Sequence, residues 1–504
     1  MGRQWQRQHW RIAVHYGMVD CMPPGLNQST AAHELAALVG PVDELSGPRY
    51  AGLARRIRDL VSAGQLPVGT RLPAERDLAA ALTTSRVTIA SAYRVLREEG
   101  WARTRHGSGT VTDSPGPAAG AGWFPHTDDG RVDLGHAAPA AAPQLAGAYA
   151  SALAQLPALT GGHGYFHNGL PELRTAIAER FTARGLPTDP DQVVVTAGVG
   201  DASSLVAEAL LEPGDRVLVA HPTYPGALRM VEGAGGRLVP VAVDAARPDD
   251  LVGAAHLAAR QSAPRLAYLE PDFANPTGAR LSASGRRRLA ATLWQQGVLT
   301  VVDEVSAELH LDGDPLPPYG AGVPDAATVT VGGLSKAVWG GLRIGWLRTD
   351  PALAARLGTA LVRRQLTVGV LDQLAATVLV RDLDAVLEGR RHALRAQRDV
   401  LLSELAARLP DRELHPPAGG LSLWCRLPAG LSSAALTAAA APRGLLLAEG
   451  RAFGTGHAFD DHIRLPFTRP AADLRAAVEV LASLAGPLRT GADRAVPAGA
   501  PTVV

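Results

Sequence analysis

The residue with the most distinctive chemistry in this sequence is Lys336, in the stretch GGLSKAVWGGLRIGW, because the chain contains no other lysine. Lysine and arginine together number 49, so 48 of these residues are arginines. A guanidinium keeps its proton in proteins, whereas a lysine amine can lose its proton and attack a carbonyl carbon. Lys336 therefore indicates a nucleophilic amine, with the chance survival of one ordinary surface lysine as the alternative.

Groups suited to hold an aromatic carbonyl cofactor follow several short apolar runs. Asp303 ends the run LTVVD, Asn275 lies in NPTG after LAYLEPD, and Tyr224 lies in HPTYPG after DRVLVA. The Gly-rich turn TAGVGDA offers backbone amides to a phosphate, and Arg343 follows the lysine by seven residues. Each feature alone is weak, because such turns and caps are common. Together they supply the carboxylate, ring-oxygen donor, flat partner and anion cradle of a pyridoxal phosphate site.

The elements that must position these groups alternate between helical segments and short β-branched runs from about residue 131 to 488. Runs such as QVVVTAG, DRVLVAHP and ATVTVGG, separated by helices, predict a parallel α/β sheet covered on both faces. Ligands bind at the carboxyl ends of strands in such sheets, which is where the motif residues stand.

Residues 49–113 have the pattern of a separate, basic unit. Helices are expected from about Tyr50 to Gly64, from Ala74 to Leu82, and from a cap at residues 83–85 to Gly100, followed by a hairpin. Eleven arginines against six acidic residues give this segment a net charge of +5. Two helices joined by a short turn, the second presenting arginine from its first turn, are typical of a helix-turn-helix, although a solvated helix face is the alternative.

Composition limits the remaining possibilities. The overall charge of +1 leaves no global attraction to nucleic acid or membrane, so any basic patch must be local. Two cysteines are too few for a disulfide framework or a structural zinc site, which fits a reducing cytosol. The N-terminus lacks the apolar stretch of a signal peptide, and prolines break the uncharged segment 137–162. We therefore expect a soluble cytoplasmic protein with no membrane span and no metal.

The expected organisation has five parts. Residues 1–48 form an extension, disordered over residues 1–30, and residues 49–113 form the basic unit. Residues 114–130 are a Pro/Gly/Ala-rich linker, residues 131–490 are the large domain, and residues 491–504 are a loose tail.

The basic unit resembles the winged-helix DNA-binding domain of the GntR regulator family, on LPAERDLA, TSRVTIASAYRVLREEGW and RHGSGT in that order. The resemblance implies that Arg76, Arg86 and Thr88 contact DNA in or beside the major groove. Ala90 stands where some family members have arginine, so one contact would be missing. The wing residues that would approach the minor groove are Arg105, His106 and Gly107.

The large domain, including HGYFHNGLPELR and HIRLPF, resembles the fold-type-I aminotransferases. The resemblance implies an internal aldimine on Lys336, with Asp303 paired to the ring nitrogen. The other implied roles are Asn275 at the ring hydroxyl, Tyr224 stacked on the ring, and Arg343 with the Gly198, Val199 and Gly200 amides at the phosphate. Arg464 would hold a substrate carboxylate, and Tyr165 would reach the phosphate site of a second subunit.

The sequence also departs from that family. Gly333 stands where a serine is usual, Asp201 adds a negative charge near the phosphate turn, and Val305 or Ser306 replaces a tyrosine that often supports the ring oxygen. These departures put efficient transamination in doubt.

The two units together resemble the MocR-type regulators, a branch of the GntR family. The resemblance implies an α/β protein with an N-terminal winged helix-turn-helix and a PLP-dependent transferase fold of type I. That fold would have a large parallel or mixed sheet and a smaller C-terminal α+β part.

The expected function is a transcription regulator with little or no turnover. It would bind a double-stranded DNA operator as a homodimer and sense an amino-acid or amine effector through pyridoxal phosphate on Lys336. One alternative is a working aminotransferase with an appended DNA-binding head. The other is a DNA-binding protein whose large domain has lost its cofactor and only dimerises.

Overall fold

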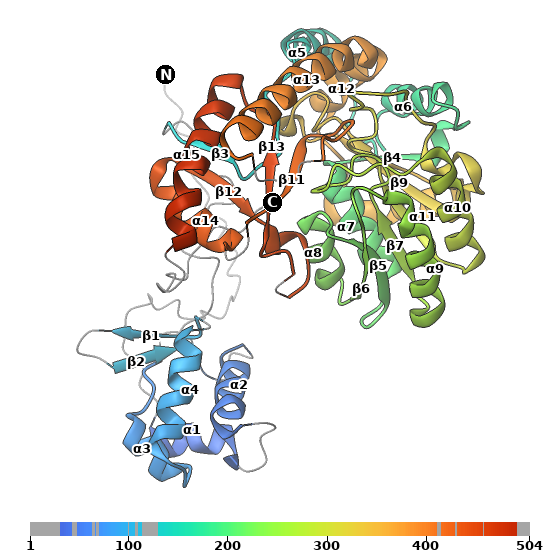
Figure 1. Cartoon of the computed structure of the whole chain (residues 1–504). Helices are drawn as coiled ribbons and strands as arrows, with labels where there is room; N and C mark the ends of the chain where they lie inside the picture. The colour runs from blue at the N-terminus through green and yellow to red at the C-terminus, as the bar shows by residue number, and fades with distance from the viewer. Residues whose placement is uncertain are drawn as a thin grey trace, which may run out of the picture. The chain divides into compact units, whose positions relative to one another are not determined.

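The computed structural model describes residues 31–42, 48–62, 66, 70–98, 100–105, 109–112, 130–410, 415–428, 431–456 and 458–490. The chain divides into two compact units, Met1–Gly120 and Ala121–Val504, each of which is described by itself (Figure 1). Within the described ranges, no helix has both the length and the apolar character needed to cross a membrane.

The first unit contains a three-helix arrangement followed by a hairpin. The helices are α2 (Arg49–Ser62), α3 (Glu75–Ala81) and α4 (Arg86–Glu98), and β1 (Ala102–Arg105) pairs antiparallel with β2 (Gly109–Thr112). The buried residues of α4 are Ile89, Ala92, Tyr93 and Leu96, at the i, i+3, i+4 and i+7 spacing of one helix face. The winged helix-turn-helix architecture expected from the sequence is confirmed.

One further helix, α1 (Ala32–Val39), lies in a segment where the sequence showed no sustained period. Its Leu35 and Val39 are buried in the same core as α2, α3 and α4. Arg56 of α2 donates to the backbone carbonyls of Leu38 and Val39, at 3.0 and 3.4 Å. This helix is therefore part of the first unit's core.

The second unit is built on a seven-stranded sheet of order β4-β10-β9-β8-β7-β5-β6. Only β10 runs antiparallel to its neighbours, so the sheet is mixed and mostly parallel. The strands are β4 (Val193–Thr196), β5 (Arg216–His221), β6 (Arg237–Ala242), β7 (Leu266–Leu269), β8 (Leu299–Asp303), β9 (Thr328–Gly333) and β10 (Gly345–Arg348).

Alternate residues of these strands are buried on opposite faces of the sheet. Leu266 and Tyr268 pack in one cluster with α7 (Val199–Leu210), α8 (Pro225–Gly233) and α11 (Pro351–Gln365). Ala267 and Leu269 pack in another with α9 (Leu251–Ser262) and α10 (Ala283–Gln295). Burial on both faces explains why the strands read as continuous apolar runs.

A smaller sheet of order β11-β13-β12-β3 contains the C-terminal strands (Figure 1). Its first strand in sequence, β3 (Val132–Leu134), pairs in parallel with β12 (Leu445–Glu449), so the smaller part is not formed by the C-terminus alone. The other strands are β11 (Ser422–Arg426) and β13 (His462–Pro466), and the flanking helices are α13 (Leu383–Arg408), α14 (Ser433–Ala440) and α15 (Ala471–Thr490). Helices α5 (Gln144–Gln155), α6 (Pro171–Ala183) and α12 (Val370–Arg381) complete the unit.

The turn between β4 and α7 fits tightly against β9 and β10. A Cβ atom on Gly345 would lie 2.5 Å from the carbonyl carbon of Gly198 and 2.7 Å from the Val199 nitrogen. A Cβ on Gly333 would lie 2.9 Å from both the Val199 Cγ2 and the Ile344 oxygen. The serine that is usual at position 333 therefore has no room, because its Cβ would meet both the Ile344 backbone and the Val199 side chain.

Replacing Gly345 should therefore destabilise the second unit. In Gly345→Ala the new methyl group meets backbone atoms rather than a movable side chain, so we expect the free energy of unfolding to fall by about 1–3 kcal/mol. Gly340→Ala is the matched control, because a Cβ there meets nothing within 4 Å. Chemical denaturation measures both values, and equal stability of the two variants would contradict the close approach.

Candidate functional site

The site lies at the carboxyl edge of the large sheet, where it meets the smaller sheet. Asp303 is the last residue of β8, and Tyr224 precedes α8 directly. Asn275 follows β7, and Lys336 lies three residues beyond the end of β9. Arg464, from β13 of the smaller sheet, donates from Nη1 to the Asn275 Oδ1 at 3.4 Å. Residues at or after strand ends of the large sheet, and one residue within β13 of the smaller sheet, therefore form this group of five sequence-predicted residues.

The Lys336 amine is enclosed and donates from Nζ to the backbone oxygen of Ala137 at 2.9 Å. Burial and the nearby Arg464 lower the pKa of Lys336 to about 8, against the opposing effect of Asp303 and Glu270. A larger fraction of the amine is therefore neutral near pH 7 than in an exposed lysine. A neutral amine in an enclosed site can add to a carbonyl carbon.

Asp303 is a buried carboxylate with only 5% of its surface exposed. Its Oδ2 accepts the Tyr268 hydroxyl at 2.7 Å, and its Oδ1 accepts the Val305 N–H at 2.9 Å. Burial raises the pKa of Asp303, while these hydrogen bonds and Lys336 act in the opposite direction. A cation placed beside this carboxylate would offset its desolvation.

The turn at the start of α7 forms a second corner of the site. Gly198 has a left-handed φ of 112°, and α7 begins at Val199, so the amides of Gly198, Val199 and Gly200 lie at a helix N-terminus. Arg343 donates from Nη2 to the Ala197 oxygen at 2.6 Å. Its guanidinium packs against Gly198, where a Cβ would lie 2.9 Å from Nη2. A guanidinium and helix N–H groups together suit an anion.

Asp201 does not place an unpaired charge at this corner. Its Oδ1 forms an ion pair with the Arg364 Nη2 at 3.0 Å. Its Oδ2 accepts the Ala197 N–H and the Gln365 Nε2–H, each at 3.0 Å. Asp201 therefore stabilises the turn through these hydrogen bonds, and Arg364 balances its charge.

Arg464 is a buried cation with unused hydrogen-bonding capacity. It is 1% exposed, and its Nε has no hydrogen-bond partner within the described part of the chain. Its guanidinium lies 5.0 Å from the Phe453 ring centroid, and Nη2 donates to the Gly135 oxygen. Burial lowers the pKa of Arg464 to about 10. A carboxylate is the ligand whose geometry and charge match such a group.

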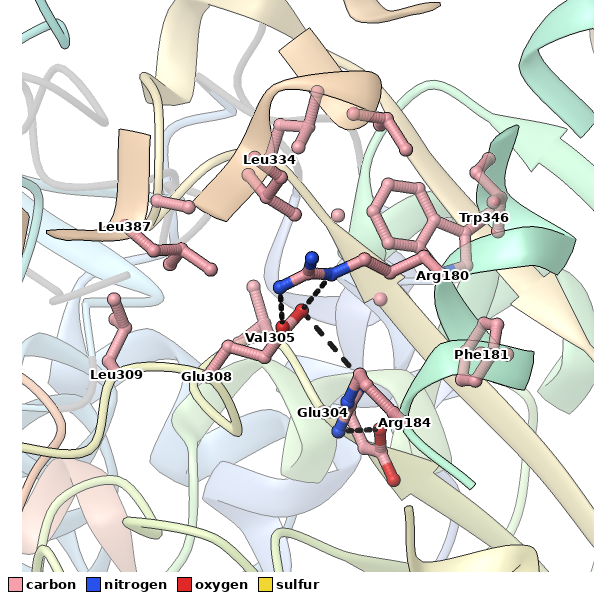
Figure 2. Close-up of a pocket in the computed structure, with 16 residues that line it drawn as sticks. Arg180, Phe181, Arg184, Glu304, Val305, Glu308, Leu309, Leu334, Trp346 and Leu387 are labelled. Carbon is pink, nitrogen blue, oxygen red and sulfur yellow. Dashed lines mark hydrogen bonds and ion pairs between the residues drawn. The ribbon is translucent and has the colours of Figure 1, made fainter. Parts of the chain in front are cut away.

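Three other residues noted in the sequence are Tyr165, Val305 and Ser306. Tyr165 is 50% exposed and stacks on His163, with ring centroids 5.5 Å apart. Val305 lines a separate cavity of about 30 Å³, beside the ion pair of Arg180 with Glu308 (Figure 2). The Val305 side chain therefore supplies no hydrogen-bond donor, although its backbone N–H bonds Asp303, and Ser306 follows it.

Several site residues were not predicted from the sequence. The Gly135 and Ala137 carbonyls contact Arg464 and Lys336 only through the backbone, so no residue type marks them. Tyr268 and Glu270 could have been found from the sequence, since both are polar side chains within the otherwise apolar run LAYLE.

In the first unit, the arginines of the helix-turn-helix are exposed. The exposed fractions of the Arg76 and Arg86 side chains are 88% and 74%. The Thr88 N–H donates to the Ser85 Oγ at 3.1 Å, which caps α4. The wing residues His106 and Gly107 and the Arg105 side chain lie outside the described residues.

Comparisons with known proteins match both units. Residues 141–481 match the aminotransferase class I and II model, and residues 49–111 match the model of bacterial regulatory proteins of the gntR family. The chain is 29% identical to the uncharacterized HTH-type transcriptional regulator YdcR of Escherichia coli, over 81% of this chain and 92% of the relative. It is also 29% identical to the HTH-type pyridoxine biosynthesis transcriptional regulator PdxR of Corynebacterium glutamicum, over 79% of this chain and 87% of that protein.

Other similar proteins are named as aminotransferases. The arginine–pyruvate transaminase AruH of Pseudomonas aeruginosa is 34% identical over 66% of this chain and 86% of the enzyme. The structure of the α-aminoadipate aminotransferase LysN of Thermus thermophilus matches with a TM-score of 0.66 and 25% identity, over 74% of this chain and 98% of that one. The chain therefore belongs to the aminotransferase class I and II family, with a gntR-family domain at its N-terminal end.

Proposed function

We propose that this chain is a pyridoxal-phosphate-dependent transcription regulator whose gntR-type unit binds a DNA operator and whose aminotransferase-like unit senses an effector. The observation that carries the proposal is the presence, on one chain, of an exposed arginine-bearing helix-turn-helix and an enclosed amine site around its only lysine. Relatives named as transcription regulators match the chain over both units.

The residues present fit pyridoxal phosphate, which the aminotransferase family implies as cofactor. Asp303 is a buried carboxylate that gains from a cationic partner, and Arg343 with the α7 N-terminus suits a phosphate. When bound, pyridoxal phosphate supplies an electrophilic carbonyl carbon and an electron-withdrawing ring. The chain's own groups then determine which amines reach that carbon and in which protonation state.

Each site residue has a role in this proposal. Lys336 is the amine that holds the cofactor, and Asp303 keeps a proton on the ring nitrogen. Asn275 bonds the ring hydroxyl and Tyr224 stacks on the ring. Arg343 and the amides of residues 198–200 hold the phosphate.

Arg464 indicates which chemical class of effector the site would bind. Its buried guanidinium has a free Nε among the described residues, which favours a ligand bearing both an amine and a carboxylate. The tight fit around Gly333 leaves no place for the usual serine hydroxyl, so the phosphate has one donor fewer. This supports sensing with little or no turnover. The similarity to the AruH transaminase favours an active aminotransferase as the second candidate, and steady production of keto acid would identify it.

We also propose that two chains act together in the cytoplasm. Tyr165 is half exposed and its ring stacks on His163, so its hydroxyl could serve the phosphate site of a second copy. A homodimer would place two helix-turn-helix units on a symmetric operator. An effector that binds one arrangement of the dimer more tightly would then shift DNA affinity.

Lys336→Arg tests the amine, because arginine keeps the positive charge but provides no neutral nucleophile. We expect the unaltered protein to develop visible absorbance with pyridoxal phosphate, and Lys336→Arg to develop none. The rate at which the absorbance develops in the unaltered protein should rise between pH 6 and 9, because the neutral amine appears as pH passes the Lys336 pKa of about 8. A band of equal strength in the variant would contradict the assignment of the amine.

Arg86→Ala tests the recognition helix. Loss of this exposed arginine should weaken operator binding by about 1–3 kcal/mol if it reads a base, or reduce the salt dependence by about one charge if it contacts a phosphate. Gel shifts at several salt concentrations distinguish the two cases. Arg260→Ala, an exposed arginine of α9 in the second unit, is the control. Equal affinities of both variants and the unaltered protein would remove Arg86 from the interface.

A further inference from the structure

Glu270 connects the two loops that flank the proposed ring position. It follows β7 directly, and its Oε2 accepts the backbone N–H of Asn275 at 3.1 Å. The backbone N–H of Tyr224 donates to the same carboxylate. One acidic side chain therefore fixes the backbone of both the ring-hydroxyl residue and the ring-stacking residue.

The second oxygen of Glu270 is not explained by packing. Oε1 is buried and has no hydrogen-bond partner among the residues that the structure describes. An oxygen in this state loses its water without a replacement donor, which disfavours folding. The hydrogen bonds that this acid makes are therefore offset in part by the desolvation of Oε1.

Glu270 lies within electrostatic reach of the amine. Burial and the Asp303 carboxylate raise the pKa of Glu270 to about 8, while Lys336 lowers it. In the other direction, Glu270 and Asp303 raise the pKa of Lys336 against burial and Arg464. The charged and titratable groups around this acid are Asp303 on β8, Tyr268 on β7, Tyr224 before α8, Lys336 after β9 and, acting through Lys336, Arg464 on β13.

We propose that Glu270 is a positioning residue for Lys336, which holds the Asn275 and Tyr224 backbones in place and titrates together with the amine. The coupling is mutual, because ionised Glu270 favours the cationic amine and the cationic amine favours ionised Glu270. Glu270 thereby determines how much of the amine is neutral at a given pH. This inference deepens the proposed role of Lys336 and rests on it.

The single lysine of the chain makes the test direct. In cofactor-free protein carrying ¹³C-labelled lysine, one side-chain NMR signal reports the ionisation of Lys336. Glu270→Gln keeps an oxygen acceptor but removes the charge, so the midpoint of this titration should fall by about 1 pH unit. Glu232→Gln, an exposed acid on α8, is the matched control and should leave the midpoint unchanged.

Glu270→Ala tests the positioning of the backbone. It removes both hydrogen bonds, so we expect pyridoxal phosphate to bind at least about tenfold more weakly, whereas Glu270→Gln should stay within about threefold. Circular dichroism checks that each variant is folded, and the Gln titration decides alone if the Ala variant is not. An unchanged titration midpoint in Glu270→Gln, or unaltered affinity in folded Glu270→Ala, overturns the inference. Absence of any cofactor on Lys336 in the unaltered protein is a different result, which rejects the proposed function instead.

Discussion

The candidate site of the second unit depends on one balance of buried charge. Two cations, Lys336 and Arg464, and two acids, Asp303 and Glu270, are withdrawn from water within one site. None of them is stable there alone, because desolvation penalises each charge and only the opposite charges offset it. The carboxyl edge of the large sheet supplies the acids and the lysine loop, and the smaller sheet supplies the arginine. The packing of the two sheets against each other therefore brings the two cations and the two acids together.

At the turn between β4 and α7, the residues that depart from the family pattern fit their surroundings. Val199 fills space that a side chain at position 333 would need, and Gly345 allows the backbone of the turn to approach β10. The extra acid, Asp201, bonds the turn and pairs with Arg364, so it does not oppose an anion. The turn still offers a helix N-terminus and a guanidinium to an anion. It lacks one hydroxyl donor, because position 333 has no room for a serine.

The fold was predictable where local patterns carry the information. The 3.6-residue period of α4 and the apolar runs ending at Asp303 and near Asn275 are local, and the winged helix and mixed α/β sheet are confirmed. Helix α1 was missed, as was the pairing of β3 with β12 across more than three hundred residues, because neither leaves a local signature. The Gly135 and Ala137 carbonyls were missed for the same reason. The roles of the individual site residues remain predictions.

Borohydride trapping followed by trypsin digestion tests the central claim most directly, namely that Lys336 holds the cofactor. Trypsin cleaves after Lys336 only while its amine is free, and arginines stand at positions 288 and 343 with none between them. If Lys336 holds the cofactor, protein reduced in the presence of pyridoxal phosphate yields an intact peptide of residues 289–343 carrying one pyridoxyl group. Cleavage after Lys336 in fully trapped protein, with no pyridoxyl group on that residue, would contradict it.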